Sequence, residues 1–243
     1  MNRLPEKKEK KRKSHRLERL LYLPLSPLFR FLFRIRVIGL ENIPKEGGCV
    51  VCSNHVALQD VLVLSAAFPR DKMPKYMAKA ELFRIPVLRR LIRALGAIPL
   101  DRGGSDVGAI HRAVELAAEG EMVTVFPQGT RQKGKNPADT PIKHGAALIA
   151  ARAGVPLLPV CIAMKNQRYA PFRRTYVLIG PPLSPEDAGL TKDGRDYRAA
   201  AEIVYARVCA LGGFTAGAAL PDAKQLAKEA ENHPAGSDGG NAP

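Results

Sequence analysis

Short apolar runs typical of buried strands alternate along this chain with segments whose apolar residues recur at helical spacing. The run 49–53 precedes an apolar helix predicted over 61–67, and the run 122–126 precedes a small-residue helix predicted over 144–153. Because parallel strands need helical crossovers, this alternation predicts an α/β fold: a single domain whose mixed, mostly parallel sheet is flanked by helices. The other predicted strands are 36–40, 76–79, 97–100, 155–162 and 175–180, the last a candidate antiparallel neighbour of the one before it, and the other predicted helices are 82–95, 107–118 and 197–211.

The length of the chain suits one such domain with appendages. It has 243 residues, of which 46% are hydrophobic, enough for a sizeable core. We expect the folded domain at 35–212. A basic and apolar segment precedes it at 1–34, and a flexible tail rich in Gly, Ala, Asp, Asn and Pro follows it at 213–243.

Positive charge points to anionic partners. The formal net charge is +15, and residues 1–20 alone hold nine Lys and Arg against three Glu. Such a balance favours nucleic acid, anionic lipid or phosphorylated substrates. Only 6% of the residues are aromatic, none of them Trp, so base-stacking platforms are scarce, and the chain carries no nucleic-acid motif. We therefore expect no nucleic acid among its partners.

The apolar run that follows the basic arm indicates a membrane surface. Residues 20–33 are mostly apolar, but Pro24, Pro27 and Arg30 interrupt them. A spanning helix needs about 20 apolar residues, and no small-residue cleavage site follows, so neither a transmembrane helix nor a signal peptide fits. We expect a helical segment lying in the interface of an anionic membrane, with a core-packed helical hairpin as the alternative. The segment 82–95 is likewise either a core helix or a basic surface that faces lipid.

Cys49 and Cys52 form a C-x-x-C pair that could be redox-active or half of a metal site. They alternate within a strand-like apolar run, and no second pair follows. We interpret them as core cysteines of a reducing compartment and expect neither a metal nor a cofactor.

Polar clusters stand where three of the predicted strands end. Asn54, His55 and Asp60 follow the first of these strands. His is the usual general base near neutral pH, and a carboxylate can orient it. The other two clusters, Asp101-Arg102-Gly103 and Gln128-Gly129-Thr130-Arg131, combine arginine with glycine, a combination that suits phosphate. If the three ends share one edge of the sheet, they form a phosphate clamp beside a general base.

Four segments resemble, in order, the sequence blocks of the glycerolipid acyltransferase family, most closely its members that acylate 1-acyl-sn-glycerol 3-phosphate. The four together are a specific signal, and the resemblance covers most of 35–185. They are Asn54-His55-x4-Asp60, Gly96 to Arg102, Phe126-Pro127-Gln128-Gly129-Thr130-Arg131 and Val155 to Val160.

The resemblance implies that a fatty acyl group passes from acyl-CoA or acyl carrier protein to the free hydroxyl of lysophosphatidic acid. The product would be phosphatidic acid, made for phospholipid biosynthesis by a peripheral protein on the cytoplasmic face of the cell membrane. His55 would deprotonate the hydroxyl and Asp60 would support His55, without a metal or cofactor. Substrate-binding residues would be Asn54, Arg102, Gly129, Thr130 and Arg131, and Pro156 and Val160 would line or shape the acyl and acceptor pocket.

One residue departs from the family pattern, which has Glu at the position of Gln128. An amide keeps an acceptor oxygen and adds two donors, so we expect a more positive phosphate pocket and leave the identity of the acceptor open. Another lysolipid or glycerol 3-phosphate is an alternative acceptor. A basic, non-enzymatic protein that binds anionic membranes is the alternative from another class, whereas a serine hydrolase is disfavoured by the absence of G-x-S-x-G.

Overall fold

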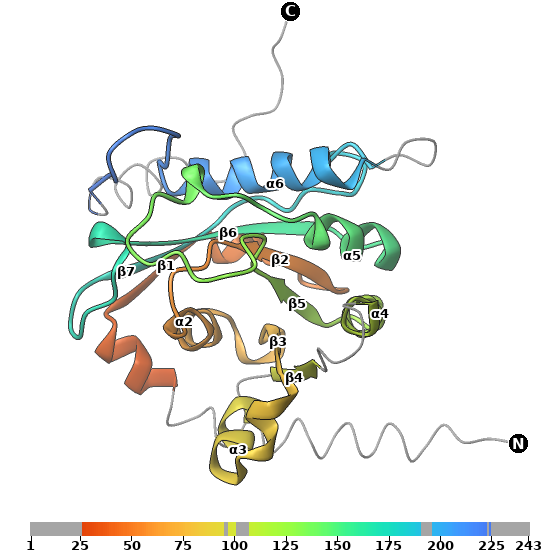
Figure 1. Ribbon diagram of the computed structural model, residues 1–243, viewed down its shortest axis with the longest axis horizontal. Coiled ribbons are helices and arrows are strands. Elements are labelled where there is room, and N and C mark those ends of the chain that lie inside the picture. The colour runs from red at the N-terminus through yellow and green to blue at the C-terminus, as the bar shows by residue number, and fades with distance from the viewer. Residues whose placement is uncertain (1–25, 95–96, 101–106, 191–195, 223, 225–243) are drawn as a thin grey trace, which may run out of the picture.

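The computed structural model describes residues 26–94, 97–100, 107–190, 196–222 and 224, and these build one seven-stranded sheet (Figure 1). The strands lie side by side in the order β1-β7-β6-β2-β5-β3-β4. Their bounds are β1 Ile35–Ile38, β2 Cys49–Ser53, β3 Lys75–Lys79, β4 Ala97–Leu100, β5 Met122–Val125, β6 Leu157–Met164 and β7 Thr175–Ile179.

The sheet is mixed and mostly parallel, as predicted. From β6 through β2, β5 and β3 to β4, each strand is parallel to the next. The predicted reversal occurs at β7, which is antiparallel to β6, and β1 is parallel to β7. The β6–β7 connection is loop 165–174, which holds only a 3-10 turn, Lys165–Gln167, and a short loop suits an antiparallel pair because such a pair needs no crossover helix.

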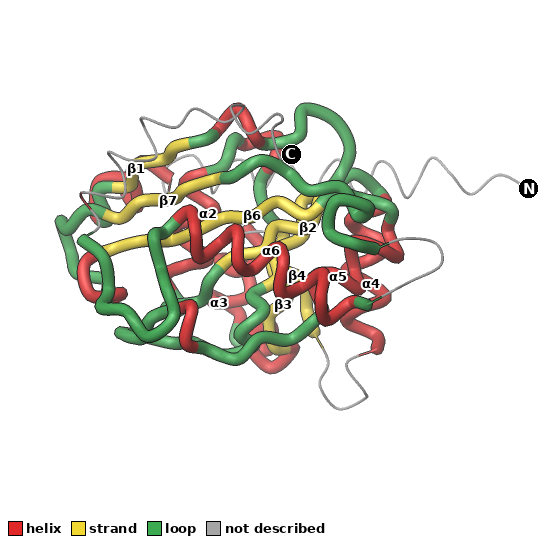
Figure 2. The backbone as a smooth tube through the Cα atoms, turned by 90° about the horizontal axis from the view of Figure 1, so that it is seen from above, coloured by secondary structure: helices red, strands yellow, loops and turns green. Residues whose placement is uncertain are grey.

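Helices cover both faces of the sheet (Figures 1 and 2). Buried residues of α4, α5 and α6 pack against one face, while α2 and a helical turn at 26–32 pack against the other. The helices are α2 Gln59–Ala67, α3 Pro86–Ala94, α4 Val107–Ala118, α5 Gly145–Ala153 and α6 Tyr197–Leu211.

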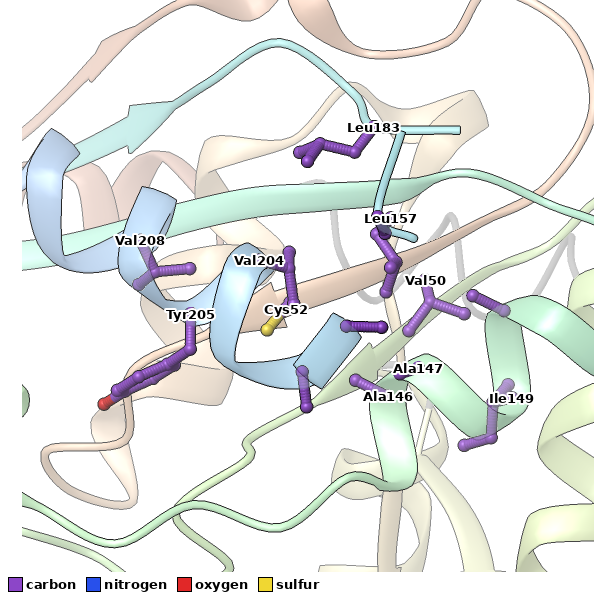
Figure 3. Packing of buried hydrophobic residues seen from close by; sticks show 14 of the residues in the cluster. Val50, Cys52, Ala146, Ala147, Ile149, Leu157, Leu183, Val204, Tyr205 and Val208 are labelled. Atoms are coloured by element: carbon purple, nitrogen blue, oxygen red, sulfur yellow. The ribbon is translucent and has the colours of Figure 1, made fainter. Parts of the chain in front are cut away.

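Strand β2 divides its side chains between the two cores. Val50 and Cys52 belong to the cluster under α4, α5 and α6, part of which is drawn in Figure 3. Cys49 and Val51 belong to the cluster under α2. All four side chains are fully buried, which is the period-two pattern of a strand covered on both faces.

The cysteines have the core role inferred from the sequence. Cys49, Cys52, Cys161 and Cys209 are all buried and free. Burial raises the pKa of the Cys49 thiol to about 12 and that of Cys209 to about 11, because a thiolate loses its hydration there.

The N-terminal segment is described only from residue 26, so residues 1–25 of the predicted interface segment lie outside the described residues. Phe33 is buried in the core beneath α2, and Phe29 and Leu32 pack partly against it. Arg30 Nε donates a hydrogen bond of 2.8 Å to the carbonyl of Ala66 near the end of α2. The turn at 26–32 therefore packs on the domain, while residues 20–25, the other part of the helical hairpin considered as the alternative, lie outside the described residues. Among the helices of the described residues, none has the length and apolar character needed to span a membrane.

The segment predicted as an amphipathic helix at 82–95 contains α3, which begins only at Pro86. Phe83 just before it is buried, and the Arg93 guanidinium lies 6.0 Å from the centre of the Phe83 ring. Arg89, Arg90 and Arg93 are exposed. This arrangement is compatible with both interpretations of the segment.

Candidate active site

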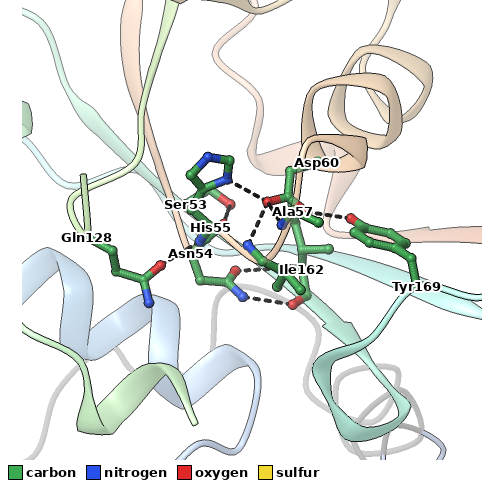
Figure 4. Close-up of polar contacts among 9 residues, drawn as sticks. Ser53, Asn54, His55, Ala57, Asp60, Gln128, Ile162 and Tyr169 are labelled. Atoms are coloured by element: carbon green, nitrogen blue, oxygen red, sulfur yellow. Dashed lines mark hydrogen bonds and ion pairs between the residues drawn. The ribbon is translucent and has the colours of Figure 1, made fainter. Parts of the chain in front are cut away.

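The centre of the candidate site is a hydrogen bond between His55 and Asp60 (Figure 4). His55 lies two residues after the end of β2, and Asp60 lies in the first turn of α2. The Nδ1 atom of His55 is 2.7 Å from Oδ2 of Asp60. The Asp60 side chain is fully buried, and the His55 side chain is 18% exposed. The pair thus sits at a strand-to-helix junction with the carboxylate inside and the imidazole open to solvent.

Backbone groups hold Asp60 in place. Its Oδ2 atom also accepts hydrogen bonds from the backbone N–H groups of Val56, at 2.6 Å, and Ala57, at 2.9 Å. These donors lie just ahead of α2, where the positive end of the helix dipole further stabilises a negative charge. A buried carboxylate needs such donors.

This geometry assigns the two imidazole nitrogens of His55. A carboxylate can only accept, so Nδ1 carries the proton and donates to Asp60. The Nε2 atom then keeps its lone pair, which is the form that a general base requires.

The segment 126–132, which follows β5, is fastened to His55 at three points. The Phe126 ring stacks on the imidazole, with ring centroids 4.1 Å apart and an interplanar angle of 15°. The His55 N–H donates to Oε1 of Gln128 at 2.6 Å, and the His55 carbonyl accepts from the N–H of Gln132 at 2.8 Å. Two of the predicted polar clusters therefore form one unit.

Gln128 is buried, and its amide makes its hydrogen bonds inside the protein. Its Nε2 atom donates to Oγ1 of Thr140 at 2.7 Å, and the Thr140 hydroxyl donates in turn to the carbonyl of Pro137 at 2.6 Å. Both ends of the amide are used within the protein, so Gln128 fixes the backbone of His55 to the loop that contains Thr140.

The next three residues are at the surface beside His55. Gly129, Thr130 and Arg131 are all exposed. Gly129 has φ +67°, a left-handed conformation that favours glycine, and its N–H closes a turn onto the Phe126 carbonyl at 3.0 Å. Arg102, the other predicted phosphate ligand, lies outside the described residues.

Lys143 is a cation of this surface that our sequence analysis missed. A side chain built on Gly129 would meet the Lys143 Nζ atom at 3.7 Å, which places this ammonium group over the turn. Its backbone N–H donates to the carbonyl of Pro127 at 2.8 Å. The only signal in the sequence was a single lysine before a helix, which is not distinctive.

Asn54 is not placed to bind a substrate, so this prediction is corrected. The residue is fully buried. Its Nδ2 donates to the Ile162 carbonyl at 2.9 Å, and its Oδ1 accepts from the Ile162 N–H at 2.8 Å. The side-chain amide of Asn54 thus takes the place of the two backbone hydrogen bonds that a further residue of β2 would make to β6, which extends beyond the end of β2.

Of the two predicted pocket residues, Pro156 needs correction, and Val160 is placed to shape the pocket but not to line it. Pro156 precedes β6, at the end of the sheet opposite His55, because β2 and β6 are parallel. Pro156 lies six positions before Ile162, which is beside the site. At about 3.3 Å per residue, the distance between them along the strand is about 20 Å. Val160 pairs with Ser53 and is fully buried in the core beneath α2, so it supports the floor of the site without lining it.

Tyr169 is a second residue that the sequence analysis missed. It lies in loop 165–174, and its hydroxyl donates to Oδ1 of Asp60 at 2.7 Å (Figure 4). No spacing rule connects residues 109 positions apart. In the part of the chain that the structure describes, no three His, Cys, Asp or Glu side chains gather closely enough to hold a metal ion.

Several known proteins resemble this chain in sequence and in fold. Residues 34–163 match the model of the acyltransferase family. The chain is 31% identical over 155 residues to the 1-acyl-sn-glycerol-3-phosphate acyltransferase of Bacillus subtilis, which covers 63% of this chain and 75% of that protein. It is 34% identical over 155 residues to a chloroplastic 1-acyl-sn-glycerol-3-phosphate acyltransferase of Brassica napus, covering 63% of this chain and 43% of the relative.

A crystal structure gives the same result for the fold. The 1-acyl-sn-glycerophosphate acyltransferase of Thermotoga maritima superimposes with a TM-score of 0.57 at 26% sequence identity. The superposition covers 89% of this chain and 86% of that one, so the likeness extends over nearly the whole fold.

Proposed function

The chain belongs to the acyltransferase family, and we propose that it transfers a fatty acyl group from a thioester to the free hydroxyl of 1-acyl-sn-glycerol 3-phosphate. The donor is acyl-CoA or acyl carrier protein, and the product is phosphatidic acid. The relatives named for this reaction support the choice of acceptor.

In the proposed reaction, Nε2 of His55 takes the proton of the acceptor hydroxyl while the hydroxyl oxygen attacks the carbonyl carbon of the thioester. A C–O bond forms and the C–S bond breaks. The leaving thiolate then takes the proton from the imidazolium, which restores the neutral base. Asp60 keeps Nδ1 protonated and stabilises the positive ring between these two steps.

One observation carries the proposal: the base and the phosphate-binding turn are parts of a single unit. Gln128, through its side chain, and Gln132, through its backbone, each make one hydrogen bond to the backbone of His55. Because these two residues lie on either side of Arg131, the chain that carries the guanidinium is held beside the base. A phosphate bound at Arg131 and Lys143 would leave the rest of a small acceptor beside the imidazole. Fixed placement of the two reactants is a large part of such catalysis.

The test is to incubate the purified protein with lysophosphatidic acid and either acyl-CoA or acyl carrier protein, and to identify the lipid product by mass spectrometry. We expect phosphatidic acid with at least one donor. Acylation of glycerol 3-phosphate or of a lysolipid without a free phosphate, and not of lysophosphatidic acid, would reassign the acceptor. No product from any acceptor would contradict the enzyme.

Replacing Arg131 with alanine is expected to raise KM for lysophosphatidic acid about tenfold, because a charge-assisted hydrogen bond to phosphate is lost. We expect kcat to change by less than about twofold, since Arg131 does not touch the reacting hydroxyl. Steady-state kinetics on vesicles measures both. Arg152→Ala is the control, because Arg152 is exposed near the end of α5, far from this edge. An unchanged KM in Arg131→Ala would contradict the clamp.

We also propose that the enzyme takes its acceptor from the cytoplasmic face of the cell membrane, which it contacts through an apolar patch of Leu28, Phe31 and Phe172. All three side chains are more than half exposed. The Phe31 and Phe172 rings meet edge to face, with centroids 5.7 Å apart. Phe172 has φ +59°, a left-handed conformation that is rare for a bulky residue and costs about 1–2 kcal/mol.

The surroundings of this patch suit an anionic lipid surface. Exposed Arg34, Arg36 and Arg173 flank it in the sequence, and basic residues near an anionic surface contribute about 1 kcal/mol each. Loop 165–174 carries Phe172 and also Tyr169, which contacts Asp60. The proposed lipid contact therefore belongs to the same edge of the sheet as the site.

A double substitution of Phe31 and Phe172 by serine is expected to lower binding to anionic vesicles by at least about tenfold, because two exposed rings no longer enter the lipid. Sedimentation with phosphatidylglycerol-containing vesicles measures it. Truncation through residue 33 would be a poorer test, since Phe33 is part of the core. Ile203→Ser, an exposed apolar side chain on α6, is the control. Equal binding of the double variant and the wild type would exclude the patch.

A further inference from the structure

Tyr169 contacts the one oxygen of Asp60 that the reaction scheme leaves without a role. Three donors converge on Oδ2: Nδ1 of His55 and the N–H groups of Val56 and Ala57. The Tyr169 hydroxyl bonds to Oδ1 instead, at 2.7 Å. The two oxygens of this carboxylate are thus held by two loops at the same edge of the sheet, one after β2 and one after β6.

This division of contacts matters because a carboxylate can rotate about its Cβ–Cγ bond. Such a rotation moves both oxygens, so the donors on Oδ2 oppose it at one oxygen only. The Tyr169 donor opposes it at the other oxygen as well, which narrows the range of directions in which Oδ2 meets the imidazole. Hydrogen bonds to charged groups are strong enough to do this, and they strengthen when water is excluded.

Tyr169 is itself fixed. Its ring packs edge to face on Phe33, with centroids 5.4 Å apart, and Phe33 is buried in the core beneath α2. Burial, together with the neighbouring charge of Asp60, holds the pKa of the Tyr169 phenol well above its usual value. The hydroxyl therefore remains a neutral donor at every pH at which the site can work.

We propose that Tyr169 is a positioning residue for the acyl transfer: it orients the Asp60 carboxylate, and through it the His55 imidazole, toward the acceptor hydroxyl. The inference rests on the proposed function of the His55–Asp60 pair. It extends the pair to a chain of three side chains, Tyr169–Asp60–His55, which no spacing in the sequence suggests.

The first experiment compares Tyr169→Phe with the wild type. The substitution removes one oxygen and keeps the ring on Phe33. We expect kcat to fall about 10- to 100-fold, the range for a lost hydrogen bond to a charged group, while KM for acceptor and donor stays within about twofold. Tyr176→Phe is the matched control, because Tyr176 is a buried tyrosine of β7 in the core on the opposite face of the sheet. A kcat within about twofold of the wild type in Tyr169→Phe would overturn the proposal.

A second experiment separates positioning from mere support of the loop. If Tyr169 acts through Asp60, the Tyr169→Phe change should lower kcat much less in an Asp60→Asn background than in the wild type, since the carboxylate that it orients is gone. An equal loss in both backgrounds would show that Tyr169 acts by another route and would overturn the inference.

A readout that does not depend on turnover keeps this inference separate from the proposed function. In the wild type, the Nδ1 proton of His55 should give a low-field NMR resonance because it is bonded to a carboxylate. We expect Tyr169→Phe to shift or broaden this resonance, and Tyr176→Phe to leave it unchanged. If the wild type shows no acyltransferase activity but Tyr169→Phe still shifts the His55 resonance, the proposed function is wrong and the positioning role of Tyr169 holds. An unchanged resonance in Tyr169→Phe would contradict the positioning.

Discussion

His55→Ala is expected to lower kcat for acyl transfer by about 10²- to 10⁴-fold, the usual contribution of a general base. The Nε2 atom is the only group we assign to remove the proton of the acceptor hydroxyl. The Nδ1 atom of the same ring donates a hydrogen bond of 2.7 Å to Asp60, which leaves Nε2 as the nitrogen that faces the acceptor. Single-turnover assays with lysophosphatidic acid and acyl-CoA measure the loss without interference from product release.

The His55→Ala variant should fold, because the links of residue 55 to its neighbours are made by its backbone. The bonds to Gln128 and Gln132 survive the substitution, whereas the stacking on Phe126 and the hydrogen bond to Asp60 are lost. His111→Ala is the control, since His111 is an exposed side chain on α4. Turnover by His55→Ala within about threefold of the wild type would refute the mechanism.

Asn54→Ala is expected to cost about 3–5 kcal/mol of unfolding free energy, the largest loss of stability that we foresee. The substitution removes the two hydrogen bonds that the Asn54 amide makes to the N–H and the carbonyl of Ile162. Asn54 is fully buried, so water does not reach the site to replace them. The Ile162 N–H is then unpaired, and the Ile162 carbonyl keeps only the long hydrogen bond of 3.4 Å from Nε2 of Gln167. Each buried group that loses its partner costs about 1–3 kcal/mol. The sum is a large part of the about 5–15 kcal/mol that keeps a typical domain folded.

Urea unfolding followed by circular dichroism measures this loss. The midpoint should fall, and activity in the absence of urea should fall with it, because His55 follows Asn54 directly. A midpoint equal to that of the wild type would show that the amide does not join β2 to β6. It would also return Asn54 to the set of candidate substrate ligands.

The sheet and most of its elements could be predicted because their signals are local. Alternation in 49–53 and the helical period in 107–118 depend only on neighbouring residues, and β2 and α4 have these same bounds. The His55–Asp60 pair could be predicted equally well, since the two residues are only five positions apart in the sequence. Helix α2 begins two residues before the predicted start, at Gln59, because the backbone groups ahead of it bond to Asp60.

The errors have a different origin. Asn54 is a polar residue in a motif, and only the parallel pairing of β2 and β6 reveals that Ile162 takes both of its hydrogen-bonding groups. Strand direction would have excluded Pro156 from the pocket, because the start of a parallel strand lies at the edge opposite the site. Tyr169 and the Thr140 partner of Gln128 come from loops, whose paths in space no periodicity predicts.

The four buried thiols make the unfolded chain chemically distinguishable from the folded one. Reaction with a thiol reagent needs an accessible thiolate. In the folded protein, burial keeps the reagent away from the cysteines and raises their pKa, so they stay uncharged thiols. A maleimide added to any variant therefore labels the molecules that have opened. Labelling in the course of the kinetic assays would record, in the same tube, whether a slow variant has lost its chemistry or its fold.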